Sequence, residues 1–148
     1  MSLSNEVAGI NTIFIDTAPV IYYIEAHPKL GPLTKEIVDS FQSGVLNAYT
    51  SVITLVEVLP KPIEAGHEQL ARRFADFLRY GKNLTLIEIS TDIAEMAGKL
   101  RGHYVFLRPM DAIQIAAALE VGADAFLTND AKLKRIKEIE ILVLKDFL

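Results

Sequence analysis

The sequence contains no cysteine among its 148 residues. This absence excludes a disulfide framework and catalysis or metal binding by thiolates, and it is compatible with a reducing compartment. A long uninterrupted apolar run is also missing, because residues such as Asp16, Glu57 and Gln114 break each candidate segment. The first nine residues lack the basic and apolar regions of a signal peptide. We therefore expect a cytoplasmic protein that does not enter a membrane.

An excess of positive charge is missing as well. The chain has 15 Lys and Arg against 19 Asp and Glu, a formal net charge of −4. This balance argues against a broad basic surface of the kind that binds nucleic acids by counterion release. It leaves open an enzyme whose acidic cluster binds divalent cations, because a bound cation reverses the local charge.

Internal repeats, low-complexity tracts and linkers are absent too. With 148 residues and 51% apolar content, the chain is long enough for one core and too short for two ordinary domains. We expect residues 1–148 to form a single domain. Because the start of the chain is polar and unpatterned, we expect residues 1–9 to be either disordered or an addition to the natural sequence. Residues 1–5 are left out of the predicted fold.

Hydrophobic patterning predicts strands and helices in alternation. Pro19 and Pro109 fit the first turns of helices, whereas Pro60 and Pro62 are expected to end the helix that Ser51 caps. The predicted strands are residues 12–15, 46–50, 83–89, 125–128 and 139–144, and the predicted helices are residues 17–26, 32–43, 51–59, 66–80, 90–103 and 109–121. Strands separated by helices predict a mostly parallel sheet covered on both faces, a three-layer α/β/α sandwich.

Four acidic side chains are expected to meet at one edge of this sheet. Asp16 directly follows the first strand, and Asp130 lies two residues beyond strand 125–128. Asp111 is in the first turn of the helix that must begin at the same edge. Glu57 lies roughly 9 Å along its helix from that edge and can still reach it. Sites in parallel sheets form beyond the carboxyl ends of strands, where the strand order reverses.

Each acid alone also has an ordinary structural explanation. Asp16 and Asp130 could cap helices, and Asp111 could interact with a helix dipole. Glu57 differs because its helix is apolar nearly all round, which predicts a buried helix, and a buried carboxylate needs a partner. If all four converge, a cation or protons must offset their repulsion, and oxygen-only ligands favour Mg²⁺ or Mn²⁺ over zinc.

Four segments carry a resemblance to a known family. They are residues 16–23 (DTAPVIYY), 51–59 (SVITLVEVL), 111–118 (DAIQIAAA) and 126–130 (FLTND). In this order and spacing they resemble the successive motifs of PIN domains. Over about residues 12–144 the chain is most similar to the VapC-type ribonuclease toxins of prokaryotic toxin–antitoxin pairs.

This resemblance implies a PIN-like fold and a Mg²⁺- or Mn²⁺-dependent endoribonuclease. It makes Asp16, Glu57, Asp111 and Asp130 the residues that hold one or two metal ions and activate water against the scissile phosphate. It further implies an RNA substrate, a homodimer and an antitoxin protein as partner.

The residues beside the four acids each have a functional and an ordinary structural interpretation. Thr128, Thr17 and Asn129 would orient carboxylates or water in such a site, or they are ordinary strand-end and turn residues. Four basic side chains near the acids could hold RNA phosphates: Arg108, Lys132, Lys134 and Arg135. Runs of charge are, however, more often part of a solvated surface. The three histidines are far apart and in no ligand spacing, so histidine-based catalysis is not expected.

Two other functions remain open. A receiver-like phosphoacceptor domain also places acids and Mg²⁺ at strand ends, and Lys145 after the last strand fits it. The first strand, however, is followed by Asp16 alone, and the third strand ends without an aspartate. A PIN fold used as an RNA-binding or interaction module with little catalysis is the second alternative, and the presence of all four acids argues against it.

Overall fold

All five predicted strands pair in one parallel sheet. In the computed structural model, which describes residues 2–148, the strands are β1 (Thr12–Ile15), β2 (Asn47–Ser51), β3 (Leu84–Ile87), β4 (Ala125–Thr128) and β5 (Glu140–Val143). Their order across the sheet is β3-β2-β1-β4-β5, and every neighbouring pair is parallel. The order of strand addition therefore reverses between β1 and β4. This order excludes the receiver-like alternative, whose strands run 2-1-3-4-5.

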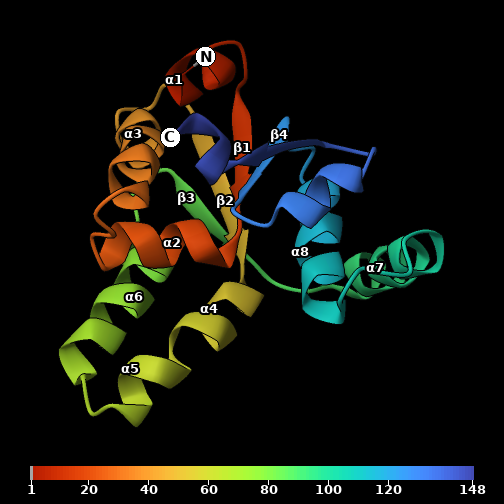
Figure 1. Cartoon of the computed structure of the whole chain (residues 1–148). Coiled ribbons are helices and arrows are strands. Elements are labelled where there is room, and N and C mark those ends of the chain that lie inside the picture. The colour runs from red at the N-terminus through yellow and green to blue at the C-terminus, as the bar shows by residue number, and fades with distance from the viewer. Residues whose placement is uncertain (1) are drawn as a thin grey trace.

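Helices cover both faces of the sheet (Figure 1). On one face lie α1 (Leu3–Val7), α2 (Thr17–Ile24), α3 (Leu30–Gln42) and α6 (Glu68–Tyr80), and on the other lie α7 (Thr91–His103) and α8 (Pro109–Glu120). Beyond the carboxyl end of β2 come α4 (Val52–Val58) and α5 (Pro60–Glu64), and the 3₁₀ turns η1 (Ala131–Arg135) and η2 (Leu144–Phe147) follow β4 and β5. The predicted three-layer sandwich is confirmed. Among residues 2–148, no helix is long and apolar enough to span a membrane.

Strand β1 separates the two cores. Ile13 and Ile15 belong to the core beneath α2 and α3, whereas Phe14 belongs to the core beneath α8. Successive strand side chains point to opposite faces, so a strand buried on both sides is apolar throughout. Phe14 stacks on its register neighbour Phe126, with ring centroids 5.5 Å apart. This packing fixes β1 against β4, and thus fixes the residues that follow each strand.

The N-terminus differs from its prediction. Instead of disorder, residues Leu3–Val7 form α1, and the Ser2 hydroxyl accepts a hydrogen bond from the Asn5 N–H at its start. Leu3 and Val7 are buried in the core that includes α3. The sequence did not reveal this helix because two apolar residues four apart make a single turn, which is too short for a periodic pattern. Residue 1, part of the same prediction, lies outside the described residues.

Helix α4 is less buried than its apolar sequence predicts. Only Thr54 and Val58 are buried, whereas Val56 and Glu57 are exposed. The helix projects past the end of β2, so neighbouring helices contact it on one side. Helix α4 ends at Val58, just before Pro60, as predicted, but Pro60 is also the first residue of a further helix. It begins α5, at a first position where the missing N–H of proline costs no hydrogen bond.

We predict that Leu3→Ala lowers the free energy of unfolding by about 2–4 kcal/mol, because it removes a fully buried side chain and leaves a cavity. Urea denaturation measures the change. Val45→Ala is the control, since Val45 is 77% exposed and its truncation should have almost no effect. Equal stability of Leu3→Ala and the unmodified chain would mean that α1 does not contribute to the fold.

Candidate active site

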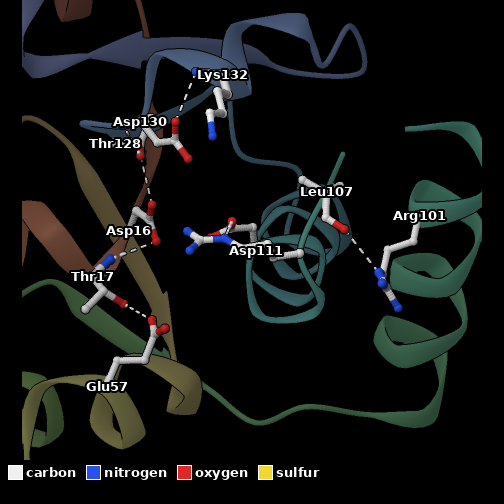
Figure 2. A network of polar contacts seen from close by, with 10 residues as sticks. Asp16, Thr17, Glu57, Arg101, Leu107, Asp111, Thr128, Asp130 and Lys132 are labelled. Atoms are coloured by element: carbon white, nitrogen blue, oxygen red, sulfur yellow. Dashed lines mark hydrogen bonds and ion pairs between the residues drawn. The ribbon is translucent and has the colours of Figure 1, made fainter. Parts of the chain in front are cut away.

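The four predicted acidic residues line one cavity beyond the carboxyl ends of β1 and β4. Its volume is about 410 Å³, and Asp16, Glu57, Asp111 and Asp130 all contribute to its wall. Figure 2 shows these side chains arranged around a shared space, each coming from a different element. The cavity lies where the strand order reverses, the position at which α/β sheets bind ligands.

Asp16 is the buried member of the group, with 9% of its surface exposed. Its Oδ1 accepts the Thr17 N–H at 2.8 Å, and its Oδ2 accepts the Thr128 hydroxyl at 2.8 Å. Burial raises the pKa of Asp16 from 3.8 to about 6. The two hydrogen bonds lower this pKa in part, and repulsion by Asp111 and Glu57 raises it further. The residue thus caps α2 and also presents a carboxylate to the cavity.

Thr128 connects two of the acids. Its hydroxyl donates to Asp16, and the same oxygen accepts the Asp130 N–H at 3.1 Å. Asp130 in turn caps η1, because its Oδ1 accepts the Lys132 N–H at 3.0 Å. The last residue of β4 therefore fixes the carboxylate of Asp16 and the backbone of Asp130.

Glu57 reaches the cavity from α4. Its Oε1 accepts the Thr17 hydroxyl at 2.5 Å. Since Glu57 is exposed, the expectation of a buried carboxylate was wrong, but the residue still has a hydrogen-bond partner. Thr17 therefore contacts two acids, Asp16 through its backbone N–H and Glu57 through its hydroxyl.

Asp111 forms an ion pair at the start of α8. The Arg108 Nε donates to Asp111 Oδ2 at 3.0 Å, and this bond raises the pKa of the Arg108 guanidinium. Three residues in from the start of the helix, the Asp111 side chain is only 16% exposed. The preceding segment is tied to α7, because the Arg101 Nε donates to the Leu107 carbonyl at 3.1 Å (Figure 2). The residue that follows Leu107, Arg108, therefore lies at the wall of the acidic cavity.

The predicted phosphate-binding residues fall into two groups. Arg108 and Lys132 line a cavity of about 140 Å³ that also includes Asp111 and Asp130. Lys134 instead pairs with Asp146, and the Arg135 guanidinium carbon lies 4.4 Å from the centre of the Phe106 ring. Only the first two basic side chains therefore border the acids.

Asn129 lines the acidic cavity, but its side-chain hydrogen bonds go to groups other than the four carboxylates. Its Nδ2 donates to the Tyr22 hydroxyl at 3.2 Å, and its Oδ1 accepts the Lys145 N–H at 3.0 Å. It connects α2 with η2. Sequence reasoning also missed Gln114, a buried amide beneath the cavity that bonds to three hydroxyl groups. The sequence feature that could have revealed it is a single polar amide in an otherwise apolar run of alanine and isoleucine, residues 112–118.

The chemistry of the site fits a hard divalent cation. All four acids are oxygen donors, and a cation would remove the repulsion that contributes to the raised pKa of Asp16. As the side chains stand, no group of three acids or histidines in residues 2–148 is arranged around one ion. Asp111 faces Arg108 and must turn for an ion to be held, whereas Glu57 can offer its Oε2 while its Oε1 keeps the bond to Thr17.

A larger groove lies at the other end of α2. It has a volume of about 690 Å³ between α2, α3 and α6. Its walls are largely apolar, including Tyr23, Ile24 and Phe77. Its charged part consists of Lys35, Arg73 and Asp76. It contains none of the four acids, so it is separate from the acidic cavity.

Comparison with known proteins identifies the family. The sequence model of the PIN-domain family matches residues 13–139 of the chain. No curated protein sequence matches the chain. Among solved structures, VapBC2 from Rickettsia felis, bound to a DNA fragment from its promoter, has a TM-score of 0.72 at 20% identity and covers 89% of this chain and 98% of that one.

Two further structures have the same fold. A toxin–antitoxin complex from Klebsiella pneumoniae has a TM-score of 0.64 at 23% identity, covering 88% of this chain and 96% of that one. VapC20 of Mycobacterium tuberculosis, described as a toxin that cleaves the sarcin–ricin loop, has a TM-score of 0.64 at 18% identity, covering 77% and 86%. Because the family match runs from β1 to the residue before β5 and includes all four acids, the chain belongs to the PIN-domain family.

Proposed function

We propose that this chain is a divalent-metal-dependent endoribonuclease that hydrolyses RNA phosphodiester bonds. The observation that carries the proposal is the convergence of four carboxylates in one open cavity at the reversal of strand order. Membership of the PIN-domain family supports a nuclease. RNA as the substrate is supported by the structural likeness to a toxin described as cleaving the sarcin–ricin loop.

The residues of the cavity have separate tasks in this reaction. Bound Mg²⁺ or Mn²⁺ makes water a stronger nucleophile and neutralises charge on the phosphoryl and leaving oxygens. Asp16 is the fixed ligand, because Thr17 and Thr128 hold both of its oxygens. Glu57 is a ligand through its Oε2, because the Thr17 hydroxyl holds its Oε1. Asp111 is the adjustable ligand, since it must turn from Arg108 toward the cavity.

We expect two basic side chains to contact the RNA backbone. Arg108 would be free to bind a phosphate if Asp111 turned to hold a cation, because the guanidinium would then lose its carboxylate partner. Lys132 borders the same acids from η1, and Figure 2 shows its side chain extending from that turn toward them. Contacts from both positive groups to phosphates would orient the RNA without contributing sequence specificity.

We also propose that the chain is the toxin of a toxin–antitoxin pair and forms a homodimer. Solved complexes of toxins with antitoxins that share the fold support the first part. The apolar groove between α2, α3 and α6 offers an antitoxin helix the kind of surface that such segments bind. The homodimer is a prediction that rests on the family resemblance.

Cleavage assays test the proposed activity. We expect RNA cleavage with Mg²⁺ or Mn²⁺ and none with a chelator. Asp16→Asn and Asp111→Asn should each reduce it by more than the roughly 10- to 100-fold effect of losing an outer partner of a metal ligand. Glu88→Gln, which removes an equal charge from an exposed position, should leave the rate unchanged. Folded acid variants that cleave at the normal rate would leave a non-catalytic PIN module as the remaining explanation.

A pH titration of stability tests the electrostatics of the site. The pKa of Asp16 is about 6 in the folded protein against 3.8 as the ordinary value, so the unfolded chain releases this proton at lower pH. Without metal, the free energy of unfolding should therefore fall as the pH rises through this window, by about 3 kcal/mol in total, and remain lower above it.

Urea denaturation at several pH values measures this decrease, and the difference between the unmodified chain and Asp16→Asn isolates the contribution of Asp16. Mn²⁺ should suppress the decrease near neutral pH, because the cation stabilises the ionised carboxylate in the folded protein. Parallel pH profiles for the two proteins would contradict the assigned pKa.

The arrangement of the basic residues predicts different roles for two neighbouring lysines. Lys132→Ala should weaken RNA binding and reduce the slope of log affinity against log salt by about 1, because one phosphate contact is lost. Lys134→Ala is the matched control, since Lys134 is engaged with Asp146. Fluorescence anisotropy with Mn²⁺ in the Asp16→Asn background measures binding without cleavage. Equal salt slopes for the two lysine variants would rule out a specific role for Lys132.

A further inference from the structure

A buried amide lies beneath the acidic cavity. Gln114 is on α8, three residues after Asp111, and is 0% exposed in a helix whose other buried residues are alanine and isoleucine. Burying an amide without partners is unfavourable. In residues 2–148 every buried side-chain nitrogen and oxygen has a hydrogen-bond partner, and those of Gln114 are hydroxyl groups from α2, β2 and α4. The amide thus joins the elements that carry Asp16 and Glu57.

The two ends of the amide have different partners. The Oε1 atom accepts the Ser51 hydroxyl at 2.5 Å. The Nε2 atom lies 2.8 Å from the Thr54 Oγ1 and 3.5 Å from the Thr17 Oγ1. Ser51 is also the N-cap of α4, because its hydroxyl oxygen accepts the Ile53 N–H at 3.1 Å. One side chain therefore contacts the start of α4 and the threonine that holds Glu57.

The hydroxyl hydrogens of this network have only one consistent arrangement. The Thr50 hydroxyl donates to the Ile15 carbonyl at 2.7 Å, so Thr50 can only accept in its 2.9 Å contact with Thr54. The hydrogen of Thr54 is therefore committed to Thr50. In the same way, the hydrogen of Thr17 is committed to the Glu57 carboxylate.

With both hydrogens committed, Thr17 and Thr54 cannot donate to each other across their 3.3 Å separation. Each of the two oxygens still accepts, and the amide of Gln114 has the two hydrogens that they need. The opposite orientation of the amide would place its oxygen against two hydroxyls that have no hydrogen to give. The acceptors Ile15 and Glu57 therefore determine the orientation of Gln114.

We propose that Gln114 is a positioning residue for Glu57, acting through the Thr17 hydroxyl. By supplying hydrogens to the oxygens of Thr17 and Thr54, the amide leaves the Thr17 hydroxyl hydrogen directed at Glu57. Gln114 does not touch the ion or the RNA. The inference rests on the proposed function, because the orientation of Glu57 affects metal binding only if Glu57 is a ligand.

A double-mutant cycle tests this inference, with the dissociation constant of Mn²⁺ measured by calorimetry on the whole chain. Thr17→Val should weaken Mn²⁺ binding about tenfold, the effect expected when a ligand loses its outer partner. Gln114→Met, of similar length but without hydrogen bonds, should weaken it severalfold. In the Thr17→Val background, Gln114→Met should add less than a further twofold, because the route to Glu57 is already broken.

Two controls separate positioning from general stability. Ile115→Ala creates a cavity in the same helix without altering the polar network, so it should lower the melting temperature and leave Mn²⁺ affinity unchanged. Raising the Mn²⁺ concentration should restore the cleavage rate of Gln114→Met, with an unchanged KM for RNA. If Gln114→Met does not fold, Gln114→Glu replaces it in the cycle, because a carboxyl group carries at most one of the two hydrogens that the amide donates.

The outcomes distinguish this inference from the proposed function. If the unmodified chain binds Mn²⁺ and Gln114→Met binds it equally well, the positioning role is wrong while the metal site stands. Effects of Gln114→Met and Thr17→Val that multiply in the double variant, or an Ile115→Ala protein that loses as much affinity, would also overturn it. If the unmodified chain binds no Mn²⁺, the proposed function fails, and this inference fails with it.

Discussion

The structure of the site depends on the burial of the Asp16 carboxylate at the end of β1. Burial in this position disfavours the charged form, and the Thr17 N–H and Thr128 hydroxyl offset only part of that effect. The geometry cannot relax easily, because β1 is fixed between β2 and β4 and is buried on both faces. The fold therefore holds a carboxylate in an unfavourable environment, which a bound cation would make favourable.

The remaining charges are arranged around this carboxylate. Glu57 and Asp111 add repulsion, and Arg108 partly compensates it through its ion pair with Asp111. Lys132 borders the same cavity, whereas Lys134 is engaged with Asp146 outside it. A chain with net charge −4 therefore still has two positive side chains, Arg108 and Lys132, beside its acidic cavity.

Threonines and one glutamine connect the cavity to the core. Thr128 links Asp16 with Asp130, and Thr17 links Asp16 with Glu57. Gln114 extends these connections into α8, so that elements on both faces of the sheet share one hydrogen-bond network. A buried network with every group satisfied is rigid, because breaking any single bond leaves another polar group unpaired. The network therefore holds Asp16 and Glu57 in place, and Asp111 is the side chain that must turn from its partner Arg108.

The sequence alone determined the alternation of strands and helices, because apolar periodicity is a local property of the chain. It also determined that Asp16, Asp111 and Asp130 would share an edge, since the carboxyl ends of parallel strands lie together. The N-terminal helix was missed because Leu3 and Val7 span a single turn, and their burial depends on α3.

Only the tertiary structure decided the rest. The order β3-β2-β1-β4-β5 depends on contacts between strands far apart in sequence, and this order makes Asp16 and Asp130 neighbours. The apolar sequence around Glu57 predicted a buried helix, but burial depends on how much of α4 other elements cover, and they cover only one side. The partners of Lys134 and Gln114 were equally hidden, because a hydrogen bond or ion pair requires two groups that the fold brings together, and local periodicity contains no information on such pairs.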